Sequence, residues 1–98
     1  MVNSVVFTPT SLRELNSILA YLRLHSSDQA AESFLNLLEK QVNYLESNLM
    51  EGRPVTSRKT IRFVLVGKYH RLYYRKHGLT LYITRAFDTR QNPDKRPY

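Results

Sequence analysis

The chain has 98 residues, with 15 lysines and arginines against eight aspartates and glutamates, and it lacks both cysteine and tryptophan. This length predicts one domain over residues 1–98, and the lack of cysteine excludes disulfides, iron–sulfur clusters and thiolate zinc sites. The net charge of +7 is unevenly distributed: residues 1–49 have three basic and five acidic side chains, whereas residues 50–98 have twelve basic and three acidic ones. The asymmetry predicts a negatively charged partner, namely nucleic acid, an acidic protein or both, with an ordinary solvated basic face as the alternative.

The hydrophobic content also limits the class of protein. At 42% hydrophobic residues, the chain is too apolar for a disordered basic tail. No segment has the pattern of a signal peptide, and none approaches the roughly 18–20 apolar residues that span a bilayer. The sequence therefore predicts a cytoplasmic protein without a membrane partner.

A strand and a helix are predicted first along the chain. Residues 2–7 are β-branched and apolar, as expected of a strand. Thr8 and Pro9 then occupy the N-cap and first positions of a helix, although a capping box formed by Ser11 and Glu14 offers a competing start. The helix has one apolar stripe, formed by Leu12, Leu15, Leu19 and Leu22.

A second helix follows a short turn. Ser26 and Gln29 fit a capping box at its start, and apolar residues recur at helical spacing to Leu49. Two helices with one apolar face each, joined by a tight turn, are expected to form an antiparallel hairpin.

The second half of the chain predicts three antiparallel strands. Gly52 and Pro54 end the second helix, and the polar, basic residues 55–60 are expected to form a loop. The strands are expected at residues 61–66, 69–76 and 79–87, with turns at Gly67-Lys68 and His77-Gly78. From about residue 89 the tail reads as irregular. The order β-α-α-β-β-β predicts a two-layer α+β fold, with the helix hairpin on one face of a mainly antiparallel sheet.

The two faces of the central predicted strand differ in character. Alternation places Tyr69, Arg71, Tyr73 and Arg75 on one face and His70, Leu72, Tyr74 and Lys76 on the other. Leu72 and Tyr74 indicate the face that packs on the helices. The opposite face alternates phenol and cation, which suits a nucleic acid or an acidic peptide; an ordinary exposed strand explains this pattern equally well.

Arg85 does not fit the alternation of the last strand. It shares a face with the apolar residues Leu81, Ile83 and Phe87. Two explanations stay open from the sequence: a bulge shifts the register near the strand end, or Arg85 lies beyond the helices.

No catalytic constellation is evident from residue spacing. His25 falls in the predicted interhelix turn, while His70 and His77 are about 23 Å apart along an extended strand. The chain lacks the common hydrolase, nucleotide-binding and zinc motifs, so neither a metal nor a cofactor is expected. A metal-free nuclease that uses Arg, Lys and Tyr side chains stays chemically open.

Taken together, these features resemble the RelE/ParE toxin superfamily, the small basic toxins of type II toxin–antitoxin modules, often called plasmid stabilisation proteins. The resemblance covers residues 2–95. It rests on the element order, on Gly52-Arg53-Pro54, on Tyr69-His70-Arg71-Leu72-Tyr73-Tyr74, and on the segment Arg85-Ala86-Phe87-Asp88-Thr89-Arg90-Gln91-Asn92-Pro93.

The superfamily implies a toxin that a cognate antitoxin neutralises, and it implies one of two mechanisms on the same fold. ParE-like members inhibit DNA gyrase, whereas RelE-like members are ribosome-dependent endoribonucleases that cut mRNA without a metal. Some nuclease members have a His-Tyr pair near the end of the last strand, where this chain has Phe87-Asp88. The ParE-like branch is therefore favoured, and with it a protein that is not an enzyme.

The resemblance also suggests functional residues. Contacts with the target or the antitoxin are expected from Arg71, Tyr73, Arg75, Arg85 and Arg90. If the chain is a ribonuclease, the catalytic candidates are Arg71, Arg85, His70 and Tyr98. A basic interaction module that has lost toxicity, and a homodimer of the free toxin, both stay open.

Overall fold

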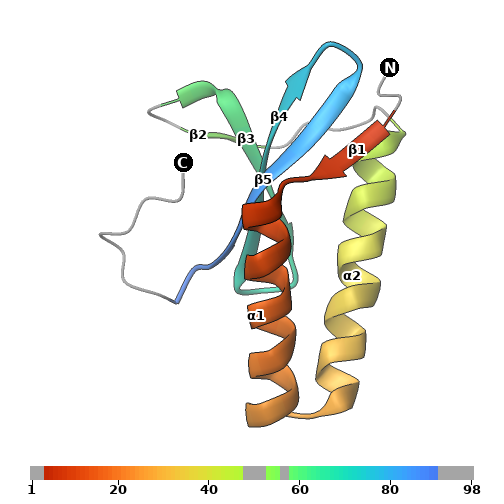
Figure 1. The fold of residues 1–98 in the computed structure, drawn as a ribbon, viewed down its shortest axis with the longest axis vertical. Coiled ribbons are helices and arrows are strands. Elements are labelled where there is room, and N and C mark those ends of the chain that lie inside the picture. The colour runs from red at the N-terminus through yellow and green to blue at the C-terminus, as the bar shows by residue number, and fades with distance from the viewer. Residues whose placement is uncertain (1–3, 48–52, 56–57, 91–98) are drawn as a thin grey trace.

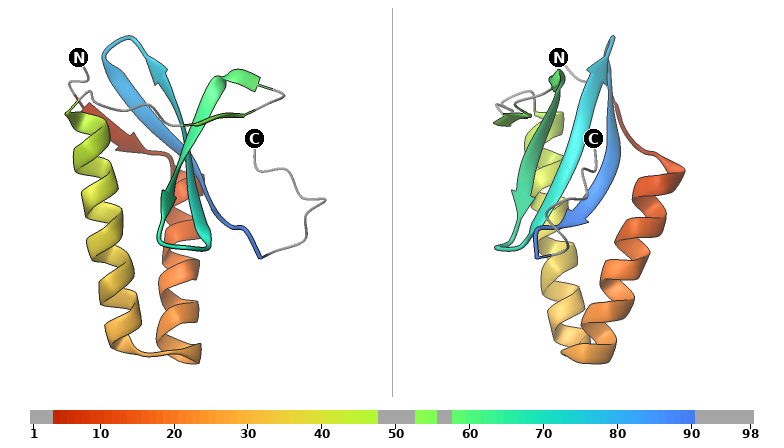
Figure 2. Two further views of the ribbon diagram at one scale, coloured as in Figure 1. Left: turned by 180° about the vertical axis from the view of Figure 1, so that it is seen from behind. Right: turned by 90° about the vertical axis from the view of Figure 1, so that its left-hand side faces the viewer.

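The computed structural model describes residues 4–47, 53–55 and 58–90, with the backbone alone for residues 53–55 and 58–60. The elements are β1 (Ser4–Phe7), α1 (Pro9–His25), α2 (Asp28–Glu46), β2 (Arg53–Val55), β3 (Arg58–Val66), β4 (His70–His77) and β5 (Thr80–Asp88). The sheet order is β1-β5-β4-β3-β2. The pair β1–β5 is parallel and the other pairs are antiparallel. Both helices lie on one side of this sheet (Figures 1 and 2), which confirms the predicted two-layer α+β fold.

The N-caps explain where the two helices begin. Thr8 caps α1, and its side chain accepts a hydrogen bond from the Ser11 backbone N–H, with Pro9 in the first turn, as predicted. Ser27, rather than Ser26, caps α2: its hydroxyl accepts from the Ala30 N–H, and Ser26 instead ends α1. The prediction of Ser26 was therefore wrong by one residue. The predicted end of the second helix at residues 49–52 lies outside the described residues.

The segment predicted as a loop is in fact mostly strand. β2 pairs with β3 from Arg53 opposite Phe63 to Val55 opposite Arg58, with a register shift after Pro54. The prediction of a loop at residues 55–60 was wrong, because backbone pairing at a sheet edge does not require apolar side chains. β4 and β5 each begin and end one residue later than predicted.

The sheet has an apolar cluster on each face. The larger cluster packs against the helices and is formed by Leu15, Phe34, Leu45, Val64, Val66, Leu72, Tyr74, Leu81, Ile83 and Ala86. The smaller cluster is formed by Ile61, Phe63 and Tyr73, with Leu65 and Phe87 packed against it. Leu72 and Tyr74 therefore face the helices, as predicted, whereas Tyr73 belongs to the opposite face.

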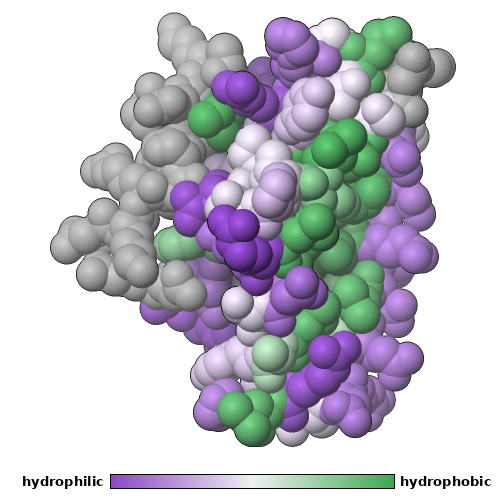
Figure 3. All heavy atoms as spheres, in the orientation of Figure 1, coloured by the Kyte–Doolittle hydropathy of each residue, from purple (hydrophilic) through white to green (hydrophobic). Residues whose placement is uncertain are grey.

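The helices leave apolar residues at the surface. Figure 3 shows a hydrophobic strip on the face that carries α1 and α2. The exposed large apolar residues of the two helices are Leu12, Tyr21, Leu24, Leu35, Leu37 and Tyr44. No helix in the described ranges has the length and apolar character needed to cross a membrane.

Candidate functional site

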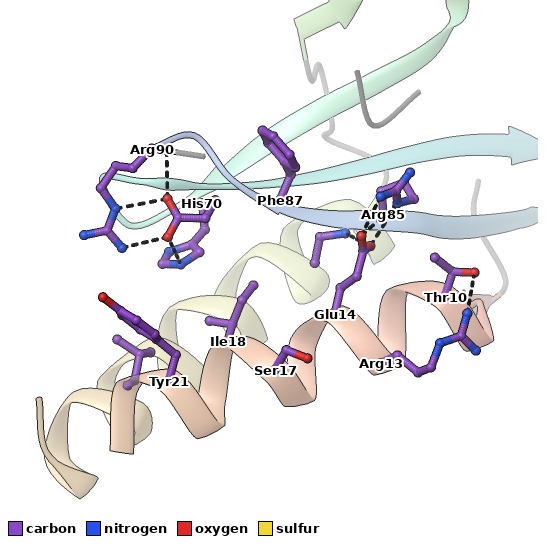
Figure 4. Close-up of a pocket in the computed structure, with 13 residues that line it drawn as sticks. Thr10, Arg13, Glu14, Ser17, Ile18, Tyr21, His70, Arg85, Phe87 and Arg90 are labelled. Carbon is purple, nitrogen blue, oxygen red and sulfur yellow. Dashed lines mark hydrogen bonds and ion pairs between the residues drawn. The ribbon is translucent and has the colours of Figure 1, made fainter. Parts of the chain in front are cut away.

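A groove of about 1060 Å³ lies between α1 and the C-terminal half of β5. It forms because β1 pairs with β5 only as far as Phe7 opposite Ile83. There the chain leaves the sheet: the Thr8 N–H donates to the Ile83 carbonyl at 3.0 Å, and the Thr8 hydroxyl donates to the Thr84 carbonyl. The groove is lined by Thr10, Arg13, Glu14, Ser17, Ile18, Tyr21, Leu22, His70, Arg85, Ala86, Phe87, Asp88 and Arg90 (Figure 4).

A bulge in β5 decides the position of Arg85. Tyr73 is opposite Arg85 and Tyr74 is opposite Ile83, so Thr84 is an extra residue in β5. Beyond the bulge, Ala86 joins the cluster on the helix side and Phe87 packs on the other side. The bulge was one of the two explanations that the sequence left open.

An ion pair joins Arg85 to helix α1. The Glu14 carboxylate accepts hydrogen bonds from Arg85 Nε at 2.9 Å and from Arg85 Nη2 at 2.7 Å. It also accepts from the backbone N–H of Ala86 at 2.9 Å. The hydrogen bonds to Glu14 raise the pKa of Arg85, so this guanidinium stays charged. Glu14 thus holds both a side chain and a backbone donor at the edge of β5.

A second charged cluster lies at the far end of the groove. Asp88 accepts from Arg90 through both carboxylate oxygens, at 3.0 and 2.7 Å, and from the Arg90 backbone N–H at 2.8 Å. The side-chain hydrogen bond from Arg90 lowers the pKa of Asp88. The Arg90 guanidinium also stacks on the Tyr69 ring, 4.3 Å from its centroid. These contacts fix Arg90 at this end of the groove, where about half of its side chain is exposed.

His70 lies behind this cluster and is buried. Its ring contacts the Phe34 ring edge-on at 4.9 Å, and its Nε2 is 3.7 Å from the Asp88 carboxylate. Burial lowers the pKa of His70 below the ordinary 6.5, with Asp88 acting in the opposite direction and Arg90 in the same one. Because burial has the largest effect, the imidazole is neutral at pH 7.

This burial predicts a pH-dependent stability. The unfolded chain binds the His70 proton at a pH near 6.5, whereas the folded chain resists it. The burial of neutral His70 therefore costs no free energy of protonation above this pH. As the pH falls below it, the unfolded chain gains a proton that the folded chain resists, and the folded state loses stability. We expect the free energy of unfolding to decrease as the pH is lowered from about 7.5 to about 5.5. The decrease should be smaller in His70→Phe. Urea titrations across this range measure the difference.

The matched control for this experiment is His77→Phe, because His77 is exposed. It should keep the slope of the unsubstituted protein. Equal slopes in His70→Phe and the unsubstituted protein would contradict the prediction.

Arg71 lies on the other side of the sheet. Its guanidinium stacks on Phe63, with Cζ 4.3 Å from the ring centroid, and its Nη1 donates to the Tyr73 hydroxyl at 3.3 Å. Its Nε is buried and has no hydrogen-bond partner among the described residues. Tyr73 is 2% exposed, so its ring supports Arg71 from within the smaller cluster.

The structure brings only some of the predicted site residues together. Arg85 and Arg90 share the groove with His70, whereas Arg71 and Tyr73 lie on the opposite face. Arg75 is exposed near the end of β4, and Tyr98 lies outside the described residues. Within the described ranges, no three histidine or acidic side chains are close enough to hold a metal ion.

Two carboxylates that hold the arginines, Glu14 and Asp88, were not predicted from the sequence as site residues. Asp88 precedes Arg90 by two residues, and this short spacing could have indicated their pairing. Glu14 is 71 residues from Arg85 and was considered only as a helix-capping residue. Nothing in the sequence alone indicates that contact.

Comparisons with known proteins identify the family. The family model described as "ParE toxin of type II toxin-antitoxin system, parDE" matches residues 5–93. A solved structure titled "Chromosomal ParDE TA system from P. aeruginosa" contains a similar chain, with a TM-score of 0.73 and 19% identity. The match covers 87% of this chain and 94% of that one, and at this identity it shows the shared fold. No curated protein gives a significant match. The chain belongs to the ParE family of toxins of type II toxin–antitoxin systems.

Proposed function

We propose that this toxin inhibits DNA gyrase without being an enzyme, and that a cognate antitoxin neutralises it by binding. The family supports a toxin and an antitoxin partner. The observation that favours inhibition by binding is the separation of His70 from Arg71, two of the residues that a nuclease would need. It also follows from the proposal that the toxin acts in the cytoplasm.

Among the described catalytic candidates, His70 and Arg85 line the groove, whereas Arg71 does not share a site with them. His70 and Arg71 are successive residues of β4, so their side chains project from opposite faces of the sheet. His70 is buried against Phe34, while Arg71 is stacked on Phe63. Arg85 already holds the Glu14 carboxylate. A single phosphate therefore cannot contact His70 and Arg71 together, and this arrangement supports binding rather than strand cleavage.

The antitoxin is proposed to use the groove and the neighbouring helix surface. The groove combines apolar side chains such as Ile18 and Leu22 with the cations Arg13, Arg85 and Arg90. Tyr21 and Leu37 add exposed apolar area on the two helices. An acidic, amphipathic segment matches this combination in both charge and polarity.

We keep the proposal that the predicted residues contact the target or the antitoxin, and their positions in the fold suggest different contributions. Arg90 is an exposed cation of the groove, as is Arg13, and Arg85 lines the groove wall. Arg71 lies on the opposite face of the sheet, beside Phe63. Arg75 lies near the hairpin end of β4. Tyr73 acts by holding Arg71 in place, because its ring is buried.

A supercoiling assay tests the proposed target. Purified toxin is expected to inhibit DNA supercoiling by gyrase, and addition of the antitoxin is expected to restore it. Arg71→Ala should raise the toxin concentration needed for half-inhibition at least about tenfold, since it removes a fixed guanidinium worth about 1.4 kcal/mol or more of binding. Arg23→Ala, on the exposed end of α1, is the matched control and should change it less than about twofold. Normal supercoiling at saturating, folded toxin would overturn the proposal.

The alternative function is ribosome-dependent mRNA cleavage. It would use Arg71 and Arg85 to stabilise the phosphate and His70 or Tyr98 to transfer a proton. Cleavage of mRNA on programmed ribosomes, lost in folded Arg71→Ala, would establish this alternative in place of gyrase inhibition. Sedimentation of the free toxin tests separately whether it forms a homodimer.

A further inference from the structure

The sheet divides into two arms beyond its central strands. β3 pairs with β4 only from Val66 opposite His70 to Arg62 opposite Tyr74. The earlier part of β3 pairs with β2, on its other side. Figure 1 shows the resulting fork, in which the β4–β5 hairpin projects away from β2 and β3.

The tip of this hairpin, residues 75–79, has an open backbone edge. Arg75, Lys76 and His77 pair with Tyr82, Leu81 and Thr80 of β5. On its other side, this part of β4 has no strand neighbour within the described ranges. Backbone N–H and C=O groups on such an edge can pair with an added strand.

The side chains of the tip are cationic and exposed. Arg75, Lys76 and His77 are all exposed, and Leu79 is 52% exposed beside them. Arg85 and Arg90 each hold a carboxylate, whereas neither Arg75 nor Lys76 forms an ion pair with a described residue. The tip therefore carries positive charge that the described part of the chain does not neutralise.

The tip is separate from the groove. None of its residues lines the groove. Thr80 and Asp88, at the two ends of β5, are eight residues apart, or about 26 Å of strand. A segment bound in the groove therefore leaves the tip available to another ligand.

We propose that the hairpin tip is a second protein-binding surface, which pairs with an acidic segment in extended conformation. The open edge of β4 supplies backbone hydrogen bonds, Arg75 and Lys76 supply charge complementarity, and Leu79 supplies an apolar contact. An extended peptide offers both N–H donors and C=O acceptors to this edge. A phosphate backbone offers acceptors only, so it cannot pair with the carbonyl groups of the edge. The proposal does not depend on gyrase being the target, because it concerns the chemistry of this surface alone.

The test is a titration of the isotope-labelled full chain followed by nuclear magnetic resonance. The probe is a short synthetic peptide in which glutamate and valine alternate; a peptide with lysine for glutamate and a single-stranded DNA oligonucleotide are the comparison ligands. Shifts are expected at the amides of residues 75–79 with the acidic peptide. The double variant Arg75→Glu with Lys76→Glu should weaken its binding at least about tenfold.

The matched control reverses two exposed charges on the helices, Arg23→Glu with Lys40→Glu, and should change the affinity less than about twofold. Circular dichroism confirms that both double variants fold. Shifts confined to residues 85–90, equal losses in the two double variants, no binding at millimolar peptide, or tighter binding of the oligonucleotide at the tip would each overturn the proposal. So would aggregation of the tip variant with unchanged peptide affinity, since Arg75 and Lys76 would then only protect a sheet edge.

Discussion

Replacing Tyr73 by alanine is expected to lower the free energy of unfolding by about 3–5 kcal/mol, the usual cost of removing a buried aromatic ring. The ring is 2% exposed and lies 5.8 Å from the Phe63 ring, in the smaller apolar cluster. A domain of this size is stable by only about 5–15 kcal/mol, so the variant should unfold at markedly lower urea. Urea unfolding followed by circular dichroism measures the loss.

Two further variants make this result specific. Tyr21→Ala removes a phenol that is 53% exposed and should change the free energy of unfolding by less than about 0.5 kcal/mol. Tyr73→Phe keeps the ring but removes the acceptor for Arg71 Nη1, and a loss of about 0.5–1.5 kcal/mol is expected. Similar stability of Tyr73→Ala and Tyr21→Ala would contradict the burial of Tyr73.

Tyr73 also illustrates what strand alternation can and cannot predict. Alternation correctly placed Tyr73 on the face opposite Leu72 and Tyr74, but it cannot indicate whether that face is covered. The neighbours that bury Tyr73 come from another strand, because Ile61 and Phe63 project to the same side. The face that the sequence predicted to be an exposed row of phenols and cations therefore includes a second, smaller apolar cluster.

The helices were predictable because their signals are local. Thr8 and Pro9 are adjacent to the turn that they begin, and the leucine spacing repeats within one element. β2 has only three residues and includes Pro54, so it is too short for any periodicity to be visible. Proline is tolerated at such a sheet edge, although in the sequence it reads as a break.

The candidate site was less predictable because it depends on contacts between distant segments. Arg85 was correctly singled out as anomalous, and a bulge explains it. The groove, however, requires β1 to end at Phe7 while β5 continues to Asp88. Strand ends are set by pairing in three dimensions, so the open edge beyond Ile83 has no signature in the sequence.

Replacing Glu14 by alanine is expected to lower the free energy of unfolding by about 1–3 kcal/mol, the cost of losing hydrogen bonds to a charged group. The carboxylate serves Arg85 and the Ala86 N–H together. The side chains of Glu14 and Arg85 are 23% and 36% exposed, so solvent screening places the effect toward the lower end. Glu39→Ala, at an exposed position of α2, should cost less than about 0.5 kcal/mol.

Hydrogen exchange at the Ala86 amide separates the two functions of Glu14. Arg85→Ala removes the ion pair but leaves the carboxylate able to accept from Ala86, so this amide should stay protected. Glu14→Ala removes both interactions, and the Ala86 amide should exchange faster than in Arg85→Ala. The double variant should then cost about 0.5–1 kcal/mol less than the sum of the single variants. Additive costs would show that the Glu14–Arg85 ion pair does not stabilise the fold, and equal exchange at Ala86 in the two single variants would show that Glu14 does not close this edge of β5.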